Sequence, residues 1–189
     1  MKVVPTALPE VLLIELDSYP DGRGIFFETF HQERYRKAGL KVAFVQDNFS
    51  RSSRNTLRGL HAQFEHAQAK LVQAVSGEIW DVAVDIRPAS PTYKKWVGIP
   101  LSGDKPQQLF VPVGFAHGFC VLSETAEVLY KCTDFYDPAN ELHLLWNDPQ
   151  LAIHWPVKNP SLSKKDLEGV SLRDIEGKLA AHFELSKTK

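Results

Sequence analysis

Several features that define other protein classes are scarce or missing from this sequence. It holds only two cysteines, Cys120 and Cys132, and they lack the close spacing of a metal-binding C-x-x-C pair. Both lie in strand-like runs, so we expect buried thiols in a reducing compartment. The apolar run from Val11 to Ile14 is short, and no stretch approaches the length needed to cross a bilayer. These absences predict a cytoplasmic protein with no membrane partner.

The chain also lacks an excess of positive charge. Its formal net charge is -1 at pH 7, and its isoelectric point is near 6.7. No basic surplus is available to counter a phosphate backbone, so we expect no nucleic-acid partner, although a few arginines could hold a small anion. Repeats, low-complexity tracts and linkers are missing too. With 189 residues, 43% of them hydrophobic, the sequence predicts one compact domain over residues 1–189.

Short strand-like segments separated by turn residues fill the middle of the sequence and indicate an all-β fold. The clearest pair covers residues 70–75 and 79–87 and is joined at Ser76-Gly77, which predicts a β-hairpin. Its second segment alternates apolar and polar residues, so we expect one face to be committed to the core. The regular spacing favours a barrel or sandwich, with further strands expected at 95–101, 108–111, 115–122 and 126–135.

Helical patterns occur only near the two ends of the chain. A short helix is expected from about Thr29 to Ala38, ending at Gly39. Ser171-Leu-Arg-Asp174 resembles a capping box and predicts a C-terminal helix over residues 171–186. Both helices are predicted to be peripheral to the strands.

Two segments place a histidine beside glycines, Arg58-Gly-Leu-His61-Ala-Gln63 and Pro112-Val-Gly-Phe-Ala-His117-Gly-Phe119. They resemble the two motifs of the cupin superfamily, which implies a double-stranded β-helix, or jelly-roll, barrel. A metal-binding cupin supplies two histidines and a glutamate from the first motif and a last histidine from the second. Here Gln63 stands at the second histidine position, and Lys70 stands where the glutamate would be. A cation there repels a divalent metal and two histidines are too few ligands, so we expect no metal.

The remaining polar residues suit removal of a proton from a carbon next to a carbonyl. That reaction needs a base near neutral pKa and a positive group at the oxygen where enolate charge develops. His61 and Lys70 meet these two needs. An acid must then return a proton to the opposite face, and a tyrosine on a nearby strand such as Tyr130 could serve.

A series of segments recurs in the order found in one enzyme family. They include Asp21 to Glu28, Gln46 to Ser50, Leu57 to His61, Lys70 to Val72, Gly77 to Arg87, Ser90 to Tyr93, Pro112 to Phe119, Glu127 to Tyr136, Glu141, Trp146 to Pro149, Ile153 to Pro156 and Leu162 to Asp166. Together they resemble the signature blocks of the dTDP-4-dehydrorhamnose 3,5-epimerases, over about residues 20–166. A single matching segment is weak evidence, but so many matching segments in the same order are specific for this family.

The resemblance implies a role for each matching residue. His61 would remove protons from C3 and C5 of a 4-keto-6-deoxyhexose, Asp166 would orient its imidazole, Tyr130 would be the acid, and Lys70 would stabilise the enolate at the C4 oxygen. Tyr136 matches the residue that stacks on the thymine ring. Positions that hold sugar, diphosphate or nucleoside are matched by Arg23, Glu28, Gln46, Asp47, Asn48, Arg58, His117, Glu141 and Lys165.

The implied reaction converts dTDP-4-dehydro-6-deoxy-D-glucose to dTDP-4-dehydro-L-rhamnose without metal or organic cofactor. Three alternatives stay open: a 3- or 5-epimerase of a related deoxysugar nucleotide, a metal-dependent cupin enzyme, and a jelly-roll module that binds nucleotide sugars without turnover. The family also implies a homodimer in which N-terminal strands extend the partner's sheet, and residues 41–49 would suit such a strand.

Each site residue also has an ordinary structural interpretation. His117 could bond locally in a tight turn, Tyr130 could pack in the core, and Tyr136 could be a rim aromatic at a subunit contact. Lys70 could lie on the surface and Asp166 could be a solvated charge. Ala62 departs from the family, which commonly has a larger residue there, and this puts fine substrate preference in doubt. No partner pattern is visible for the other histidines, His31, His66, His143 and His154.

Overall fold

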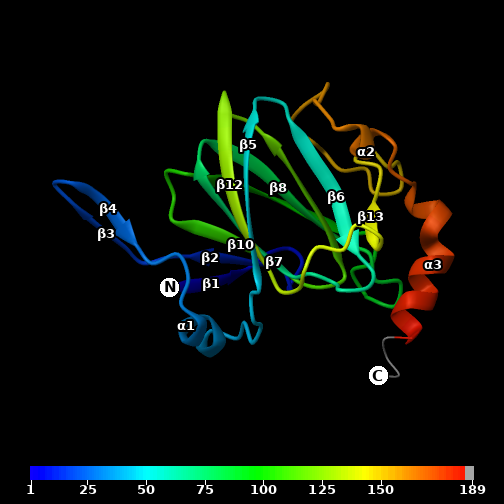
Figure 1. Cartoon of the computed structure of the whole chain (residues 1–189), viewed down its shortest axis with the longest axis horizontal. Helices are drawn as coiled ribbons and strands as arrows, with labels where there is room; N and C mark the ends of the chain where they lie inside the picture. Colours follow the sequence, from blue (N-terminus) through cyan, green and yellow to red (C-terminus); the bar gives the residue numbers. More distant parts are fainter. Residues whose placement is uncertain (186–189) are drawn as a thin grey trace.

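The structure is a computed structural model that describes residues 1–185 (Figure 1). Its strands are β1 (Lys2–Pro5), β2 (Leu12–Glu15), β3 (Ser18–Asp21), β4 (Gly24–Phe27), β5 (Gln46–Ser53), β6 (Leu57–Gln63), β7 (Lys70–Ser76), β8 (Glu78–Asp85), β9 (Trp96–Ser102), β10 (Gln107–Val111), β11 (Phe115–Val121), β12 (Thr125–Cys132) and β13 (Glu141–His143). Its helices are α1 (Gln32–Lys37), α2 (Lys164–Leu167) and α3 (Leu172–Leu185).

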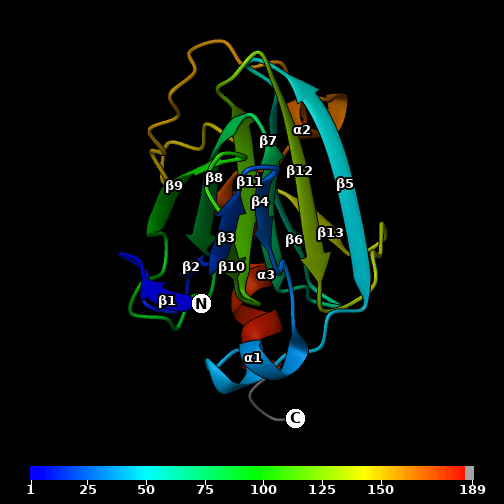
Figure 2. The same cartoon turned by 90° about the vertical axis from the view of Figure 1, so that its left-hand side faces the viewer.

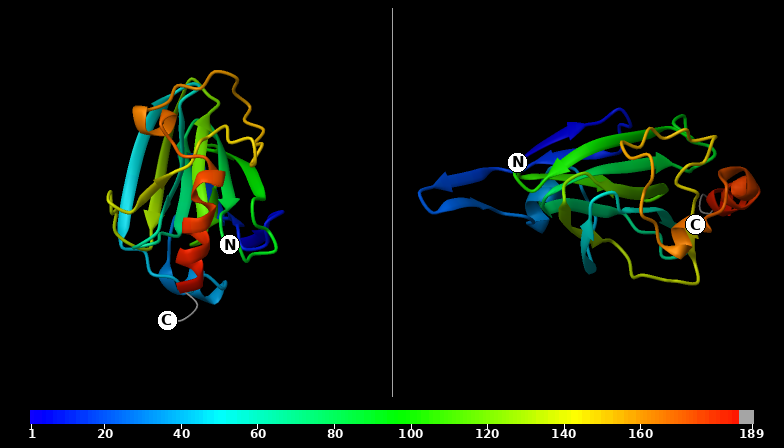
Figure 3. Two further views of the ribbon diagram at one scale, coloured as in Figure 1. Left: turned by 90° about the vertical axis from the view of Figure 1, so that its right-hand side faces the viewer. Right: turned by 90° about the horizontal axis from the view of Figure 1, so that it is seen from above.

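Two antiparallel sheets face each other and form the body of the molecule (Figures 2 and 3). One has the order β1-β2-β10-β7-β12-β5 and the other the order β13-β6-β11-β8-β9. Most neighbours in each sheet are far apart in sequence, as expected when a chain passes back and forth between the two sheets of a jelly roll. The predicted all-β jelly roll is confirmed, and the strands expected between residues 95 and 135 are present.

The predicted hairpin between residues 70–75 and 79–87 is wrong. Both segments are strands, but β7 pairs with β10 and β12 in one sheet, whereas β8 pairs with β9 and β11 in the other. Gly77 lies between them with a positive φ of 73°, and a Cβ there would lie 2.1 Å from the carbonyl oxygen of Thr125. The chain therefore turns from one sheet to the other at this glycine instead of folding back beside itself.

Strand β8 is buried on both faces, where one buried face was expected. Ile79 and Ala83 join the core between the sheets, and Val82 and Val84 pack on the other side in a cluster that includes α3. A third cluster, which includes Ile14, Tyr35 and Phe110, packs α1 against the six-stranded sheet. The two aspartates of β8, Asp81 and Asp85, are fully buried and hydrogen-bonded. The sheet that carries β8 is thus covered on both sides.

The helices lie at the periphery, as predicted. α1 covers fewer residues than expected and ends before Gly39, whose φ is 101°. α3 begins after Ser171, whose Oγ accepts a hydrogen bond from the backbone N–H of Asp174, so the predicted N-cap is confirmed. Ser186, the last residue of the predicted helix, lies outside the described residues. Among residues 1–185, no helix combines the length and apolarity required to span a membrane. Both cysteines are buried free thiols.

The hairpin formed by β3 and β4 projects away from the two sheets (Figure 1). It carries exposed apolar side chains, with Tyr19, Ile25 and Phe26 more than half exposed. Residues 41–45, expected to belong to an added strand, have no regular structure, and β5 begins only at Gln46. β5 forms the edge of the six-stranded sheet.

Candidate active site

A cavity of about 450 Å³ opens between the two sheets. The five-stranded sheet supplies the residues on β6, β11 and β13, and the six-stranded sheet supplies those on β5, β7 and β12. The cavity brings together most of the predicted site residues, namely Gln46, Asn48, Arg58, His61, Lys70, His117, Tyr130, Tyr136, Glu141, Lys165 and Asp166. Residues separated by up to 120 positions in sequence are therefore neighbours in one pocket.

His61 and Asp166 form the closest titratable pair in this cavity. Nε2 of His61 lies 2.6 Å from Oδ1 of Asp166, although the residues are 105 positions apart. Asp166 is 4% exposed, and its Oδ2 accepts a hydrogen bond of 2.7 Å from the hydroxyl of Ser163, the N-cap of α2. The carboxylate is thus held from both oxygens, and it can fix the orientation and tautomer of the imidazole.

Burial and hydrogen bonding act in opposite directions on this pair. Burial raises the pKa of Asp166, but hydrogen bonds from His61 and Ser163 outweigh it, so the pKa lies below the usual value. Burial lowers the pKa of His61, the hydrogen bond to Asp166 opposes this, and the charge of Lys70 lowers it further, for a net decrease. A neutral imidazole beside an ionised carboxylate is the form required of a general base.

Two glycines let the strand that carries His61 approach its neighbour closely. A Cβ on Gly59 would lie 2.5 Å from the Cα of Gly118, and φ of Gly59 is 118°. The pairing of β6 with β11 places His61 opposite His117 and shifts register just beyond. The glycines of the two histidine motifs are therefore needed for strand packing, and they set both histidines at the cavity.

Lys70 and Tyr130 face the cavity from the sheet opposite His61. They lie on the neighbouring strands β7 and β12. Burial lowers the pKa of the Lys70 ammonium, while Cys132, Glu141 and Asp81 raise it more weakly. Burial also raises the pKa of Tyr130, which keeps its hydroxyl protonated at neutral pH. Lys70 is therefore not a surface residue, and Tyr130 lines the cavity as well as packing against the core between the sheets.

His117 is anchored by a buried carboxylate. Its Nε2 lies 2.9 Å from Oδ1 and 3.1 Å from Oδ2 of Asp81, which is fully buried on β8. This partner is a strand residue and not the local turn partner considered from sequence. Asp81 itself was not predicted, because its place in an alternating pattern marked it as solvent-facing.

The mouth of the cavity carries a small polar network. Oε2 of Glu141 accepts a hydrogen bond of 2.8 Å from the Tyr136 hydroxyl and lies 3.6 Å from Nζ of Lys165. The hydrogen bond to Glu141 raises the pKa of Tyr136, a residue that is 47% exposed. The backbone N–H of Tyr136 donates to the side chain of Gln46. An exposed aromatic face is thus held beside charged groups at the rim.

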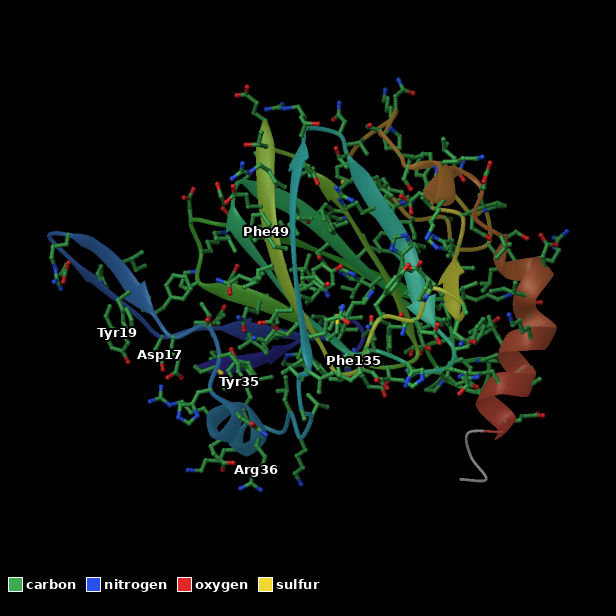
Figure 4. All side chains as sticks on the ribbon, viewed as in Figure 1. Asp17, Tyr19, Tyr35, Arg36, Phe49 and Phe135 are labelled. Atoms are coloured by element: carbon green, nitrogen blue, oxygen red, sulfur yellow. The ribbon has the colours of Figure 1, made fainter. Side chains whose placement is uncertain are left out.

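Three predicted binding residues lie outside this cavity. Arg23 is at the tip of the β3–β4 hairpin, 91% exposed and paired with Asp21, and Glu28 pairs with Arg34. Figure 4 labels Tyr19 on the same hairpin, remote from the cavity-lining strands. Asp47 points away from the cavity and contacts Lys131 at 2.9 Å, because side chains alternate along β5. The chain's own pocket therefore does not include the side chains of these three residues.

His143 lines the cavity although no role was predicted for it. It lies opposite His61 in the pairing of β13 with β6, with the two ring centroids 4.7 Å apart. Its Nε2 is 2.9 Å from Oε2 of Glu141. The spacing Glu141-Leu-His143 is a usable signal, since residues two apart on a strand face the same side. Ser163, the hydroxyl that supports Asp166, had no comparable signal.

The residues at the metal positions of a cupin do not fit a divalent ion. Lys70 places an ammonium in the cavity, and Nε2 of His117 is already bound by Asp81. A metal between His61 and His117 would face a cation and find one imidazole engaged. These positions therefore do not form the metal site of a cupin.

Comparison with known proteins decides the family. Residues 5–174 match the family described as dTDP-4-dehydrorhamnose 3,5-epimerase. The chain is 51% identical over 178 residues to a Shigella flexneri protein of that name, covering 93% of this chain and 98% of that protein. This chain belongs to the dTDP-4-dehydrorhamnose 3,5-epimerase family. The predicted family and enzyme class, a carbohydrate epimerase, are thereby confirmed.

Solved structures of epimerases share the fold. A Legionella pneumophila dTDP-6-deoxy-D-glucose-3,5-epimerase, in complex with dTDP-4-keto-L-rhamnose, is 48% identical, with a TM-score of 0.91 and coverage of 94% of this chain and 96% of that one. ChmJ, a 3'-monoepimerase from Streptomyces bikiniensis in complex with dTDP-quinovose, is 29% identical, with a TM-score of 0.87 and coverage of 97% and 96%. The cupin jelly roll of this family is therefore the fold of this chain.

Proposed function

We propose that this epimerase inverts C3 and C5 of dTDP-4-dehydro-6-deoxy-D-glucose to give dTDP-4-dehydro-L-rhamnose. One observation carries the proposal: the His61–Asp166 pair lines one wall of the cavity and Tyr130 lines the opposite wall. Inversion at carbon requires a base on one face and an acid on the other, and two facing sheets supply them. The similarity to the Shigella and Legionella epimerases supports the substrate.

His61 is the proposed base at each carbon. With Nε2–H bound to Asp166, Nδ1 accepts the proton when the C3–H bond breaks, and the electron pair moves into the C4 carbonyl as an enolate. The imidazolium that forms is stabilised by the adjacent carboxylate. Its proton then passes to solvent, and the same sequence is repeated at C5.

Lys70 and Tyr130 complete each inversion. The Lys70 ammonium faces the C4 oxygen and stabilises the enolate charge in a site partly closed to water. The Tyr130 hydroxyl delivers its proton to the opposite face of the carbon, and the phenolate regains a proton from solvent. No oxidant, reductant or cofactor enters this balance.

The rim of the cavity is proposed to hold the nucleotide. Tyr136 stacks on the thymine ring, and Arg58 and Lys165 pair with the diphosphate. The side chains of Gln46 and Asn48, which bond each other at 3.0 Å, and of His117 and Glu141 contact sugar or nucleoside. This arrangement suits a nucleotide sugar whose anionic diphosphate lies at the positively charged rim while its sugar lies beside the neutral base inside the cavity.

A homodimer is the proposed assembly. The projecting β3–β4 hairpin exposes three large apolar side chains, and a second copy of the chain would bury them. Arg23 at the tip of the hairpin and Glu28 just after it lie outside the chain's own cavity. In the dimer they would contact the substrate bound to the partner. Asp47 is also proposed to bind substrate, although its side chain faces Lys131 and not the chain's own cavity.

Solvent-deuterium incorporation tests the proposed reaction. The enzyme is incubated with substrate in D₂O, and NMR follows the signals of C3–H and C5–H. Exchange at both carbons is expected, and failure at both would contradict an epimerase acting on this substrate. Exchange at C3 alone would select a monoepimerase, the alternative favoured by the similarity to ChmJ.

A further inference from the structure

His143 lies between two carboxylates inside the cavity, those of Glu141 and Asp166. Its Nε2 lies 2.9 Å from Oε2 of Glu141, which as a carboxylate can only accept, so Nε2 carries the proton. In the neutral ring, Nδ1 is then an acceptor. It is buried without a hydrogen-bond partner among the described residues and lies 4.0 Å from Oδ1 of Asp166. Two acceptor atoms at this separation offer ligands to a cation that can replace the missing hydrogen-bond partner.

A third ligand atom completes a set around the same point. One donor atom each from His61, His143 and Asp166 lies within 4.8 Å of the others. Ligands on tetrahedral Zn²⁺ at about 2.0–2.1 Å are separated from one another by about 3.3 Å. Oδ1 of Asp166 lies 2.6 Å from Nε2 of His61 and 4.0 Å from Nδ1 of His143, and these two separations bracket that value. Because all three atoms lie within 4.8 Å of one another, any pair must draw together by at most about 1.5 Å to ligate one ion.

The surroundings of these residues resemble the supports of metal ligands. A metal-bound histidine usually donates its other ring N–H to a carboxylate, as His143 does to Glu141. The free oxygen of Asp166 is held by the hydroxyl of Ser163. Lys70 and Lys165 oppose an ion with their positive charge, since Lys70 acts on His61 and Lys165 lies 3.6 Å from Glu141. These cations limit the affinity to that of a reversible site.

We propose that His61, His143 and Asp166 form an inhibitory site for Zn²⁺, with the fourth coordination position open to the cavity. An ion held by Nε2 of His61 forces the ring proton onto Nδ1, so the nitrogen that takes the substrate proton loses its lone pair. The epimerase would therefore be silenced by zinc and restored by a chelator. The ligand set differs from that of metal-binding cupins, since only His61 is shared, and the site goes beyond the proposed reaction.

Metal binding itself is the test. Calorimetry of Zn²⁺ with metal-free protein, and the visible spectrum of the Co²⁺-loaded protein, report stoichiometry and geometry. One ion per chain with a tetrahedral Co²⁺ spectrum is expected. His143→Gln should weaken Zn²⁺ binding by at least about tenfold. The control is His66→Gln, because His66 is an exposed histidine 3.4 Å from Asp134 and should leave binding unchanged.

Two outcomes would overturn the proposal: no stoichiometric ion, or binding that survives His143→Gln unchanged. Circular dichroism confirms that the variant is folded, and Asp166→Asn serves as the second ligand variant if it is not. Zinc should also inhibit the wild-type enzyme at lower concentration than it inhibits His143→Gln. Because binding is read from the metal, its result stands even if the substrate assignment fails.

Discussion

The carboxylate of Asp166 fixes the tautomer of the His61 ring and supports its protonated form. Asp166→Asn keeps the size of the side chain but removes the charge that supports the imidazolium, and its amide can turn the ring to the wrong tautomer. We expect kcat to fall by about 10²–10⁴-fold. Asp134→Asn is a matched control, since Asp134 also lies beside a histidine, at 3.4 Å, but outside the cavity lining. Steady-state kinetics with kcat unchanged in Asp166→Asn would exclude a positioning role.

Burial is the largest cause of the lowered pKa of His61, and the charge of Lys70 lowers it further. Lys70→Gln should therefore raise that pKa. Wild-type activity should fall only as pH drops through a pKa below the usual histidine value of about 6.5, because the base must be neutral. NMR titration of the His61 ring measures the change, and Lys2→Gln, at an exposed lysine, should have no effect. A pKa that falls in Lys70→Gln would contradict this electrostatic account.

The partners of single residues were predictable to different degrees. The resemblance paired His61 with Asp166, and the two atoms are 2.6 Å apart. His143 was missed although its hydrogen-bond partner Glu141 is only two residues away, because its other neighbours, His61 on β6 and Asp166 on α2, come together only in the fold. Asp81 was missed because an acid in an alternating strand normally faces water, whereas here a buried histidine satisfies it.

At the scale of elements, β6 and β11 must approach closely to set His61 and His117 in place. Gly59→Ala puts a Cβ 2.5 Å from the Cα of Gly118 and requires a left-handed backbone. We expect a loss of about 2–5 kcal/mol of unfolding free energy, from strain and overpacking together. Urea unfolding measures it. Gly22→Ala, which meets nothing within 4 Å, should change stability little; an equal loss in both variants would argue against the close approach.

The elements themselves were more predictable than their pairing. Alternation and turn residues identified β7 and β8 as strands, but the period of a strand does not say which neighbour it pairs with. A tight turn at Gly77 is compatible both with a hairpin and with a crossing from one sheet to the other. The crossing is decided by long-range contacts with β10, β11 and β12, which local sequence does not encode.

At the scale of the whole molecule, the proposed dimer makes each site depend on two chains. Arg23→Ala and His61→Ala chains, each of low activity alone, are mixed under conditions that exchange subunits. A mixed dimer would hold one site with His61 intact and Arg23 supplied by the partner, so about a quarter of wild-type activity should return. No recovery in mixed dimers confirmed by mass would mean that Arg23 does not act in the partner's site.

The two facing sheets place base and acid on opposite sides of the substrate, and deuterium exchange in matched variants tests this arrangement. In D₂O, Tyr130→Phe should retain exchange at C3 and C5, because His61 still removes and returns protons on its own face, yet it should not invert either carbon. His61→Asn should lose exchange altogether. NMR of the recovered sugar reads deuterium content and configuration together. Exchange that persists in His61→Asn, or inversion that continues in Tyr130→Phe, would contradict the account.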